Sequence, residues 1–171
     1  MDGHNVVDTS VRGTRVMVVD DNSLLCRSTA SGLARAGYHV VTAFDGDQAI
    51  EQAIATPPDV AVIDLFMPVS GFTVIRALKK AHGEAIHVIA MTANDTEDTR
   101  QASFEAGSDG FVVKPTSVED LSRHVAVAAR HQRAFVEARL VGESAERQRA
   151  YYTEATALVA HDRQRQQPEP R

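Results

Sequence analysis

Length, composition and charge restrict the chain to one globular domain with an appendage and exclude several classes of partner. Its 171 residues, 43% apolar and 24% charged, suffice for one well-packed core, and no stretch approaches the roughly 20 apolar residues of a membrane span. Acidic residues exceed basic ones by 17 to 11 over residues 1–130, and residues 131–171 mix 6 acidic with 7 basic ones, so the clustered positive charge of a nucleic-acid surface is missing.

The beginning of the chain has no pattern of a folded element. Residues 1–13 are polar, contain acids and have no apolar run of signal-peptide type, so we expect a disordered leader there and a cytoplasmic protein. Further along, the single cysteine, Cys26, lies in an apolar helical pattern. That position favours a buried structural thiol over a nucleophile.

Strand-like and helix-like segments alternate regularly from residue 15 to residue 130. Short apolar runs predict five strands, over residues 15–20, 39–43, 59–64, 87–92 and 110–113. The intervening segments predict five helices, with apolar positions from Leu24 and Leu25 to Ala36 in the first, then over residues 46–55, 72–81 and 96–106, and from about Ser117. This alternation is typical of an α/β fold that is doubly wound around a parallel sheet.

Beyond residue 130 the strand signals stop while helical composition continues. We expect a helical extension over residues 131–162, interrupted near Gly142, and a disordered tail rich in Gln, Arg and Pro over residues 163–171. Four apolar side chains of the extension are candidates for a homodimer contact: Phe135, Leu140, Tyr151 and Leu158.

Charged residues follow three of the predicted strands. Asp20 and Asp21 come at the end of the first strand, Asp64 ends the third, and Lys114 follows the fifth, while Thr92 adds a hydroxyl at the end of the fourth. Because the carboxyl ends of parallel strands meet at one edge of a sheet, we expect these side chains to lie close together.

Three neighbouring carboxylates require a cation to neutralise them. Mg²⁺ prefers oxygen ligands and is usually held by one or two carboxylates together with phosphate oxygens. Lys114 and Thr92 would add an ammonium and a hydroxyl to the same pocket. Such a set can hold a phosphoryl group during in-line transfer, where catalysis is mostly positioning and charge neutralisation.

Four short motifs together resemble the receiver domain of two-component response regulators: Asp20-Asp21, residues 64–71 (DLFMPVSG), Met91-Thr92-Ala93 and Lys114-Pro115. The resemblance covers residues 14–130. It implies a flavodoxin-like fold in which a five-stranded parallel sheet has the strand order 2-1-3-4-5. It also implies a histidine kinase or a phosphotransfer protein as the phosphoryl donor, and an output through protein–protein contacts.

The resemblance implies a role for each residue at the acidic end of the site. Asp64 corresponds to the phosphoacceptor, a carboxylate nucleophile. Asp21, Asp64 and the backbone carbonyl of Phe66 correspond to direct Mg²⁺ ligands, and Asp20 to a ligand that acts through metal-bound water. Phosphorylation and dephosphorylation would be at most self-catalysed, without a separate enzymatic domain.

The resemblance also implies a conformational switch. Lys114 would pair with Asp64 before phosphorylation and with a phosphoryl oxygen afterwards, and the Lys114-Pro115 bond would be cis. Thr92 would move to hydrogen-bond the new phosphate, and Phe111 would turn inward behind it. The added charge would then make two packings of the neighbouring fourth helix and fifth strand unequally populated.

Two other functions remain open from the residues. An aspartyl-nucleophile phosphatase would normally have a second acid two residues after the nucleophile, where this chain has Phe66. A fragment of a hybrid histidine kinase is the other alternative, because residues 151–162 end in His161-Asp162 like the start of a phosphoaccepting helix. The residues that follow, 163–168, depart from the expected continuation.

Overall fold

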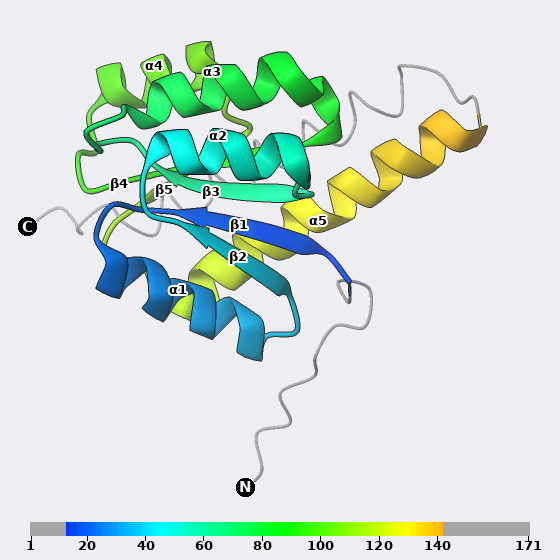
Figure 1. The fold of residues 1–171 in the computed structure, drawn as a ribbon, viewed down its shortest axis with the longest axis horizontal. Helices are drawn as coiled ribbons and strands as arrows, with labels where there is room; N and C mark the ends of the chain where they lie inside the picture. Colours follow the sequence, from blue (N-terminus) through cyan, green and yellow to red (C-terminus); the bar gives the residue numbers. More distant parts are fainter. Residues whose placement is uncertain (1–12, 142–171) are drawn as a thin grey trace, which may run out of the picture.

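Strands and helices alternate along the whole described part of the chain. A computed structural model describes residues 13–141 (Figure 1). The strands are β1 (Arg15–Val19), β2 (His39–Ala43), β3 (Val60–Asp64), β4 (His87–Thr92) and β5 (Gly110–Val113). The helices are α1 (Ser23–Arg35), α2 (Gly46–Ala55), α3 (Gly71–His82), the short 3₁₀ turn η2 (Gly83–Ala85), α4 (Glu97–Ala106) and α5 (Val118–Val141).

The five strands form one sheet in the order β2-β1-β3-β4-β5, and every neighbouring pair is parallel. This confirms the predicted α/β fold and strand order. In the register, Val19 lies opposite Ile63, and Asp64 opposite Met91. The central strands therefore end at nearly the same level, which brings the residues after them to one edge.

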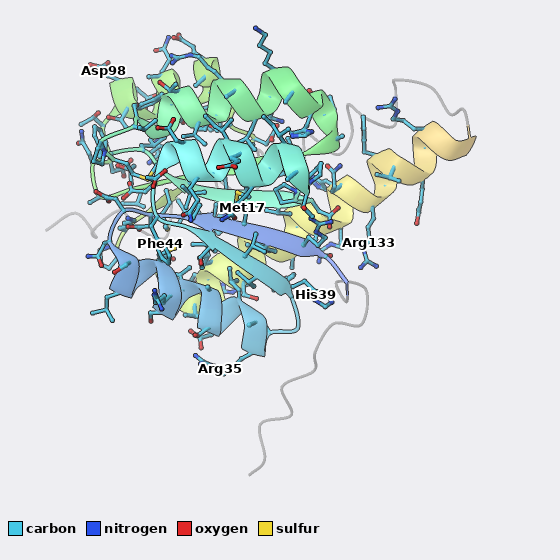
Figure 2. All side chains as sticks on the ribbon, viewed as in Figure 1. Met17, Arg35, His39, Phe44, Asp98 and Arg133 are labelled. Atoms are coloured by element: carbon cyan, nitrogen blue, oxygen red, sulfur yellow. The ribbon has the colours of Figure 1, made fainter. Side chains whose placement is uncertain are left out.

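Helices cover both faces of the sheet, so that its central strands are buried on both sides. Alternate residues of β1 point to opposite faces: Met17 and Val19 pack toward α2, α3 and α4, whereas Val16 and Val18 pack toward α1 and α5 (Figures 1 and 2). Each face is a separate apolar cluster. A continuous apolar run in the sequence is the expected signature of a strand buried in this way.

The buried face of α1 is narrower than the sequence predicts. Leu24 and Leu25 are 79% and 40% exposed, so their predicted place on the apolar face is wrong. The buried residues of the helix are Cys26, Gly32 and Leu33. Gly32 permits close packing of α5, because a Cβ atom there would lie 2.5 Å from a methyl carbon of Val118.

The last helix continues past residue 130, where the sequence places the start of an extension. Its first half is buried against the sheet through Leu121 and Val125, and its later part projects beyond the sheet (Figure 1). No helix in residues 13–141 is long and apolar enough to cross a membrane. Residues 1–12 of the leader predicted over residues 1–13, and the features predicted over residues 142–171, including His161, lie outside the described residues.

Candidate functional site

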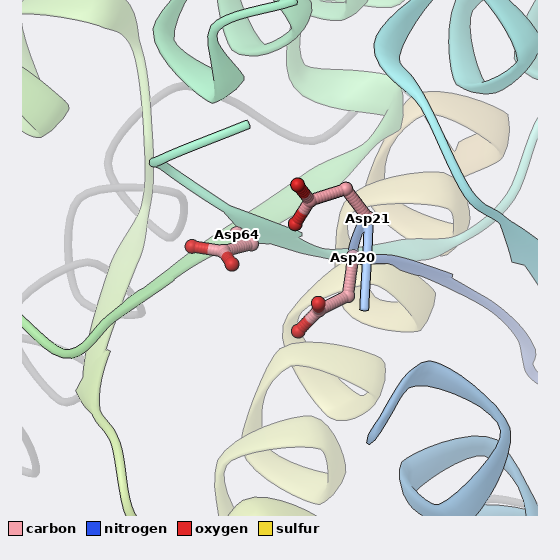
Figure 3. Close-up of side chains that lie close together, drawn as sticks. All are labelled: Asp20, Asp21 and Asp64. Carbon is pink, nitrogen blue, oxygen red and sulfur yellow. The ribbon is translucent and has the colours of Figure 1, made fainter. Parts of the chain in front are cut away.

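The carboxylates predicted to meet at the carboxyl edge of the sheet do lie together. Asp20 and Asp21 follow β1, and Asp64 is the last residue of β3 (Figure 3). Each contributes an oxygen atom, and these oxygens lie within 4.8 Å of one another. Asp20 and Asp64 are buried, whereas Asp21 is exposed, so the cluster is open to solvent on one side.

Asp20 is fixed in place through both carboxylate oxygens. Its Oδ1 accepts a hydrogen bond from the Asn22 backbone N–H at 2.9 Å, and its Oδ2 accepts one from Lys114 Nζ at 2.7 Å. Aspartates before a helix often cap it, but here Asn22 caps α1, because its side chain accepts from the Leu25 N–H. Asp20 and Asp21 are thus not needed to begin the helix.

Asp64 is held by the loop that follows its strand. Its Oδ1 accepts from the Phe66 N–H at 3.1 Å, and its Oδ2 accepts from Lys114 Nζ at 2.8 Å. Gly71 closes that loop by donating its N–H to Leu65 O at 3.0 Å. A Cβ atom on Gly71 would lie 2.1 Å from the Asp64 carbonyl oxygen, so only glycine fits there.

Lys114 is the cation that joins the two buried aspartates. Its ammonium donates to both Asp20 and Asp64, and the Lys114-Pro115 peptide bond is cis as predicted. Burial acts to lower the pKa of Lys114, but the hydrogen bonds to the two carboxylates outweigh it, so the pKa is raised. The ammonium stays charged at neutral pH. Its contact with Asp20 was not expected from the sequence.

Thr92 lies fully buried at the end of β4, beside the cluster. Its Oγ1 accepts from the Asn94 N–H at 3.0 Å, and Asn94 Nδ2 donates to Thr99 Oγ1 at 3.3 Å. Thr96 caps α4 by accepting from the Thr99 N–H. Hydrogen bonds therefore join the loop between Thr92 and α4 both to the end of β4 and to the first turn of α4.

Phe111 on β5 is already buried, with 3% of its surface exposed, so the expected turn on phosphorylation would start from a buried ring. The guanidinium carbon of Arg100, on α4, lies 4.5 Å from the centre of the Phe111 ring, and Arg100 pairs with Asp95. Sequence reasoning missed Arg100. No signal in the local pattern identifies it, because the contact depends on how α4 packs on β5.

The donor set fits a hard divalent cation. Three carboxylates and one ammonium leave a net charge of about −2 at the cluster. Carboxylate oxygens are the ligands that Mg²⁺ prefers, and exposed Asp21 leaves room for the waters that this ion retains. A phosphate oxygen could approach from the same side, toward Asp64 and Lys114.

Comparison with known proteins places the described fold in one group. Residues 16–126 match the family described as "Response regulator receiver domain". Transcriptional regulatory protein PrrA of Mycobacterium leprae is 38% identical over 129 residues, which are 75% of this chain and 55% of that protein. Response regulator MprA of Mycobacterium ulcerans is 35% identical over 108 residues, 63% of this chain and 46% of that one. The chain spans about half the length of these curated relatives.

Solved structures agree with the sequence matches. Chemotaxis protein CheY4 of Vibrio cholerae has a TM-score of 0.63 at 29% identity, covering 66% of this chain and 96% of that one. A CheY-like receiver domain protein of Methanospirillum hungatei has a TM-score of 0.67 at 22% identity, covering 71% of this chain and 97% of the other. The second likeness bears on the fold alone.

Proposed function

The chain belongs to the response-regulator receiver family of two-component systems, and we propose that it accepts a phosphoryl group onto Asp64 from a histidine kinase or a phosphotransfer protein. The observation that carries this proposal is the pairing of Asp64 with Lys114 inside a cluster of three carboxylates. Asp64 is buried yet adjoins the exposed Asp21 side of the cluster, from which a donor can approach.

The proposed transfer is an in-line displacement at phosphorus. A carboxylate oxygen of Asp64 forms the new O–P bond while the P–N bond of the donor phosphohistidine breaks, and the imidazole nitrogen keeps the electron pair. Lys114, which already bonds Asp64 Oδ2, is placed to neutralise a phosphoryl oxygen. Asp20 holds the other side of the ammonium and so fixes its direction.

A magnesium ion is the proposed cofactor. Asp20, Asp21 and Asp64 would hold it with the backbone carbonyl of Phe66, Asp20 acting through water. Bound there, the ion would neutralise charge on the phosphoryl oxygens. The net negative charge of the cluster supports this assignment.

Phosphorylation would act on the rest of the domain through Thr92 and Phe111. Two negative charges and strong acceptor oxygens would appear beside Thr92, whose hydroxyl hydrogen can donate to them. The proposed consequence is a changed packing of α4 and β5 that alters contacts with partner proteins.

The proposed organisation is a receiver over residues 14–130 with a helical extension over residues 131–162 and a tail over residues 163–171. Since α5 runs unbroken through residue 130, the extension would begin as a direct continuation of the last receiver helix. Phe135 and the later apolar residues would supply a homodimer contact. The proposed partners are proteins, with neither nucleic acid nor membrane among them.

The proposal is tested by intact-mass measurement after incubation with acetyl phosphate and Mg²⁺. Wild type should gain the mass of one phosphoryl group, and removal of Mg²⁺ by a chelator should prevent the gain. Asp64→Asn should gain none, because it lacks the nucleophile. Asp98→Asn, which changes an exposed aspartate on the outer side of α4, should behave as wild type (Figure 2).

The same measurement on His161→Gln separates the hybrid-kinase alternative. A phosphoryl group that survives in Asp64→Asn but disappears in His161→Gln would move the acceptor to His161. Phosphorylation lost only in Asp64→Asn would support the receiver function.

A further inference from the structure

Arg100 on α4 contacts Phe111, one of the two residues of the proposed switch. It pairs with Asp95 in the loop that follows the other, Thr92. Resting on the proposed function, we infer that Arg100, held by Asp95, is a positioning residue that keeps Phe111 in its unphosphorylated setting. The Arg100–Asp95 pair would thereby couple the loop after Thr92 to β5. This assigns a regulatory role to a residue outside the acidic cluster.

The first observation is the burial of the Arg100 side chain. Its relative exposure is 9%, against 41% for its partner Asp95. Burying a guanidinium is costly unless it is paired, so the Asp95 carboxylate is needed to keep Arg100 inside. Over the Phe111 ring, at 4.5 Å from its centre, the desolvated cation gains a favourable cation–π contact.

The second observation is that Asp95 belongs to a hydrogen-bonded loop anchored on Thr92. The Asn94 N–H donates to Thr92 Oγ1, and the Asn94 side chain donates to Thr99 on the first turns of α4. Arg100 follows Thr99 directly in α4, and its backbone N–H donates to Thr96 O at 3.0 Å. A displacement of Thr92 is therefore transmitted to Asp95.

The consequence follows from the position of the proposed phosphoryl group. If it draws Thr92 toward Asp64, Asp95 shifts with the loop and no longer faces Arg100 in the same way. An unpaired buried guanidinium is unfavourable, so Arg100 leaves the ring face. The Arg100–Phe111 contact then stabilises only the unphosphorylated population, and its strength sets the balance between the two.

The inference is tested by the initial rate of Asp64 phosphorylation with acetyl phosphate at saturating Mg²⁺. When only one setting of the loop is competent, the rate scales with its population. Arg100→Met removes the cation but keeps an unbranched apolar side chain over the ring, so the rate should rise about threefold or more. Damage to the fold alone would lower the rate.

The partner residue gives a second variant that leaves the buried side chains intact. Asp95→Ala should raise the rate in the same direction, because Arg100 then leaves the ring for solvent. The double variant should be no faster than the faster single variant, since both remove one contact. Amide hydrogen exchange should show β5 less protected before phosphorylation in each.

A matched control is the Arg123–Asp120 pair on α5, which is exposed to solvent and lies on another helix than Arg100. Arg123→Met should leave the rate unchanged. Should Arg100→Met fail to fold, Asp95→Ala decides the question alone. Equal or slower phosphorylation in that folded variant, with unchanged β5 exchange, overturns the inference.

The outcome is distinct from a failure of the proposed function. Absence of phosphorylation in wild type would reject Asp64 as the acceptor. Beryllium fluoride with Mg²⁺, a mimic of an aspartyl phosphate, would then still report on the Arg100–Asp95 pair. In that case a β5 exchange response equal in wild type and Asp95→Ala would reject the inference.

Discussion

Individual side chains at the site are constrained more tightly than their sequence motifs reveal. The motifs identify Asp20, Asp64 and Lys114, yet the bridge that Lys114 makes to both aspartates is visible only in three dimensions. Strand order explains this, since β1 lies beside β3 and brings Asp20 next to Asp64. The contact of Arg100 was likewise not predictable, because Arg100 lies on α4 and its partner Phe111 on β5.

Gly71 offers a test of how tightly the loop after Asp64 is built. Gly71→Ala places a methyl group 2.1 Å from the Asp64 carbonyl oxygen, so the loop must shift. We expect urea unfolding to show a loss of about 1–3 kcal/mol, the usual cost of overpacking. Phosphorylation should also slow, because the loop carries the Phe66 N–H that bonds Asp64.

The matched control is Gly110→Ala on β5. There the added Cβ atom would meet its nearest neighbour, a carbon of Ile89, at an ordinary 3.6 Å. Its unfolding free energy should change by less than about 1 kcal/mol. Equal losses in the two variants would show that the close contact at Gly71 is not what matters.

Between elements, β4 and α5 meet through two histidines. The rings of His87 and His131 lie 6.0 Å apart, edge to face. Burial, with smaller effects of the nearby positive groups Lys79 and His131, lowers the pKa of His87 from 6.5 to about 3. The folded state therefore binds its proton less readily than the unfolded chain.

Because of the lowered pKa of His87, the free energy of unfolding should depend on pH. The contribution of neutral, buried His87 to the free energy of unfolding is fully present above pH 6.5. It is lost as the pH falls from 6.5 toward 3, with a slope of up to about 1.4 kcal/mol per pH unit. Urea unfolding at a series of pH values should show a shallower decline for His87→Gln than for wild type. Nearby Asp109, whose pKa burial raises, acts in the opposite sense in both proteins.

The exposed histidine at the start of β2 is the control for this comparison. His39→Gln should follow the wild-type decline, because its ring stays in solvent in both states. Parallel curves for wild type and His87→Gln would contradict the assignment of the pH dependence to His87.

The helix α5 belongs to the core along its first half only. Leu121 is 2% exposed and packs in the cluster beneath the sheet, whereas Val136 is 45% exposed. Leu121→Ala should lower the free energy of unfolding by about 2–5 kcal/mol. Val136→Ala should change it by less than about 0.5 kcal/mol, and equal effects in a chemical unfolding series would contradict this division.

Element positions were largely predictable, and the differences have local causes. The bounds of β2, β4 and β5 agree with the predicted ones, because apolar runs and turn residues delimit them. β1 ends one residue earlier than predicted, before Asp20, whose side chain accepts hydrogen bonds from the Asn22 N–H and from Lys114. The 3₁₀ turn Gly83–Ala85 was not predicted, since a single turn leaves no periodic pattern.

For the molecule as a whole, the arrangement of the sheet is what makes the site predictable. In a parallel doubly wound sheet every strand ends at the same edge, so residues far apart in sequence converge without further information. Asp20 and Lys114 are 94 positions apart and yet are hydrogen-bonded. The arrangement of the sheet fixes where these residues lie but not what each one does, because burial and hydrogen bonding do not select the oxygen that receives phosphorus.

Chemical trapping tests directly whether Asp64 receives the phosphoryl group in a Mg²⁺-dependent reaction. Borohydride reduces an acyl phosphate to an alcohol with release of phosphate, which converts a phosphorylated aspartate into homoserine. Peptide sequencing by mass spectrometry after acetyl phosphate, Mg²⁺ and borohydride should find homoserine at position 64, and none when Mg²⁺ is withheld. Homoserine at another aspartate, or phosphate retained on His161 with position 64 unchanged, would show that Asp64 is not the acceptor.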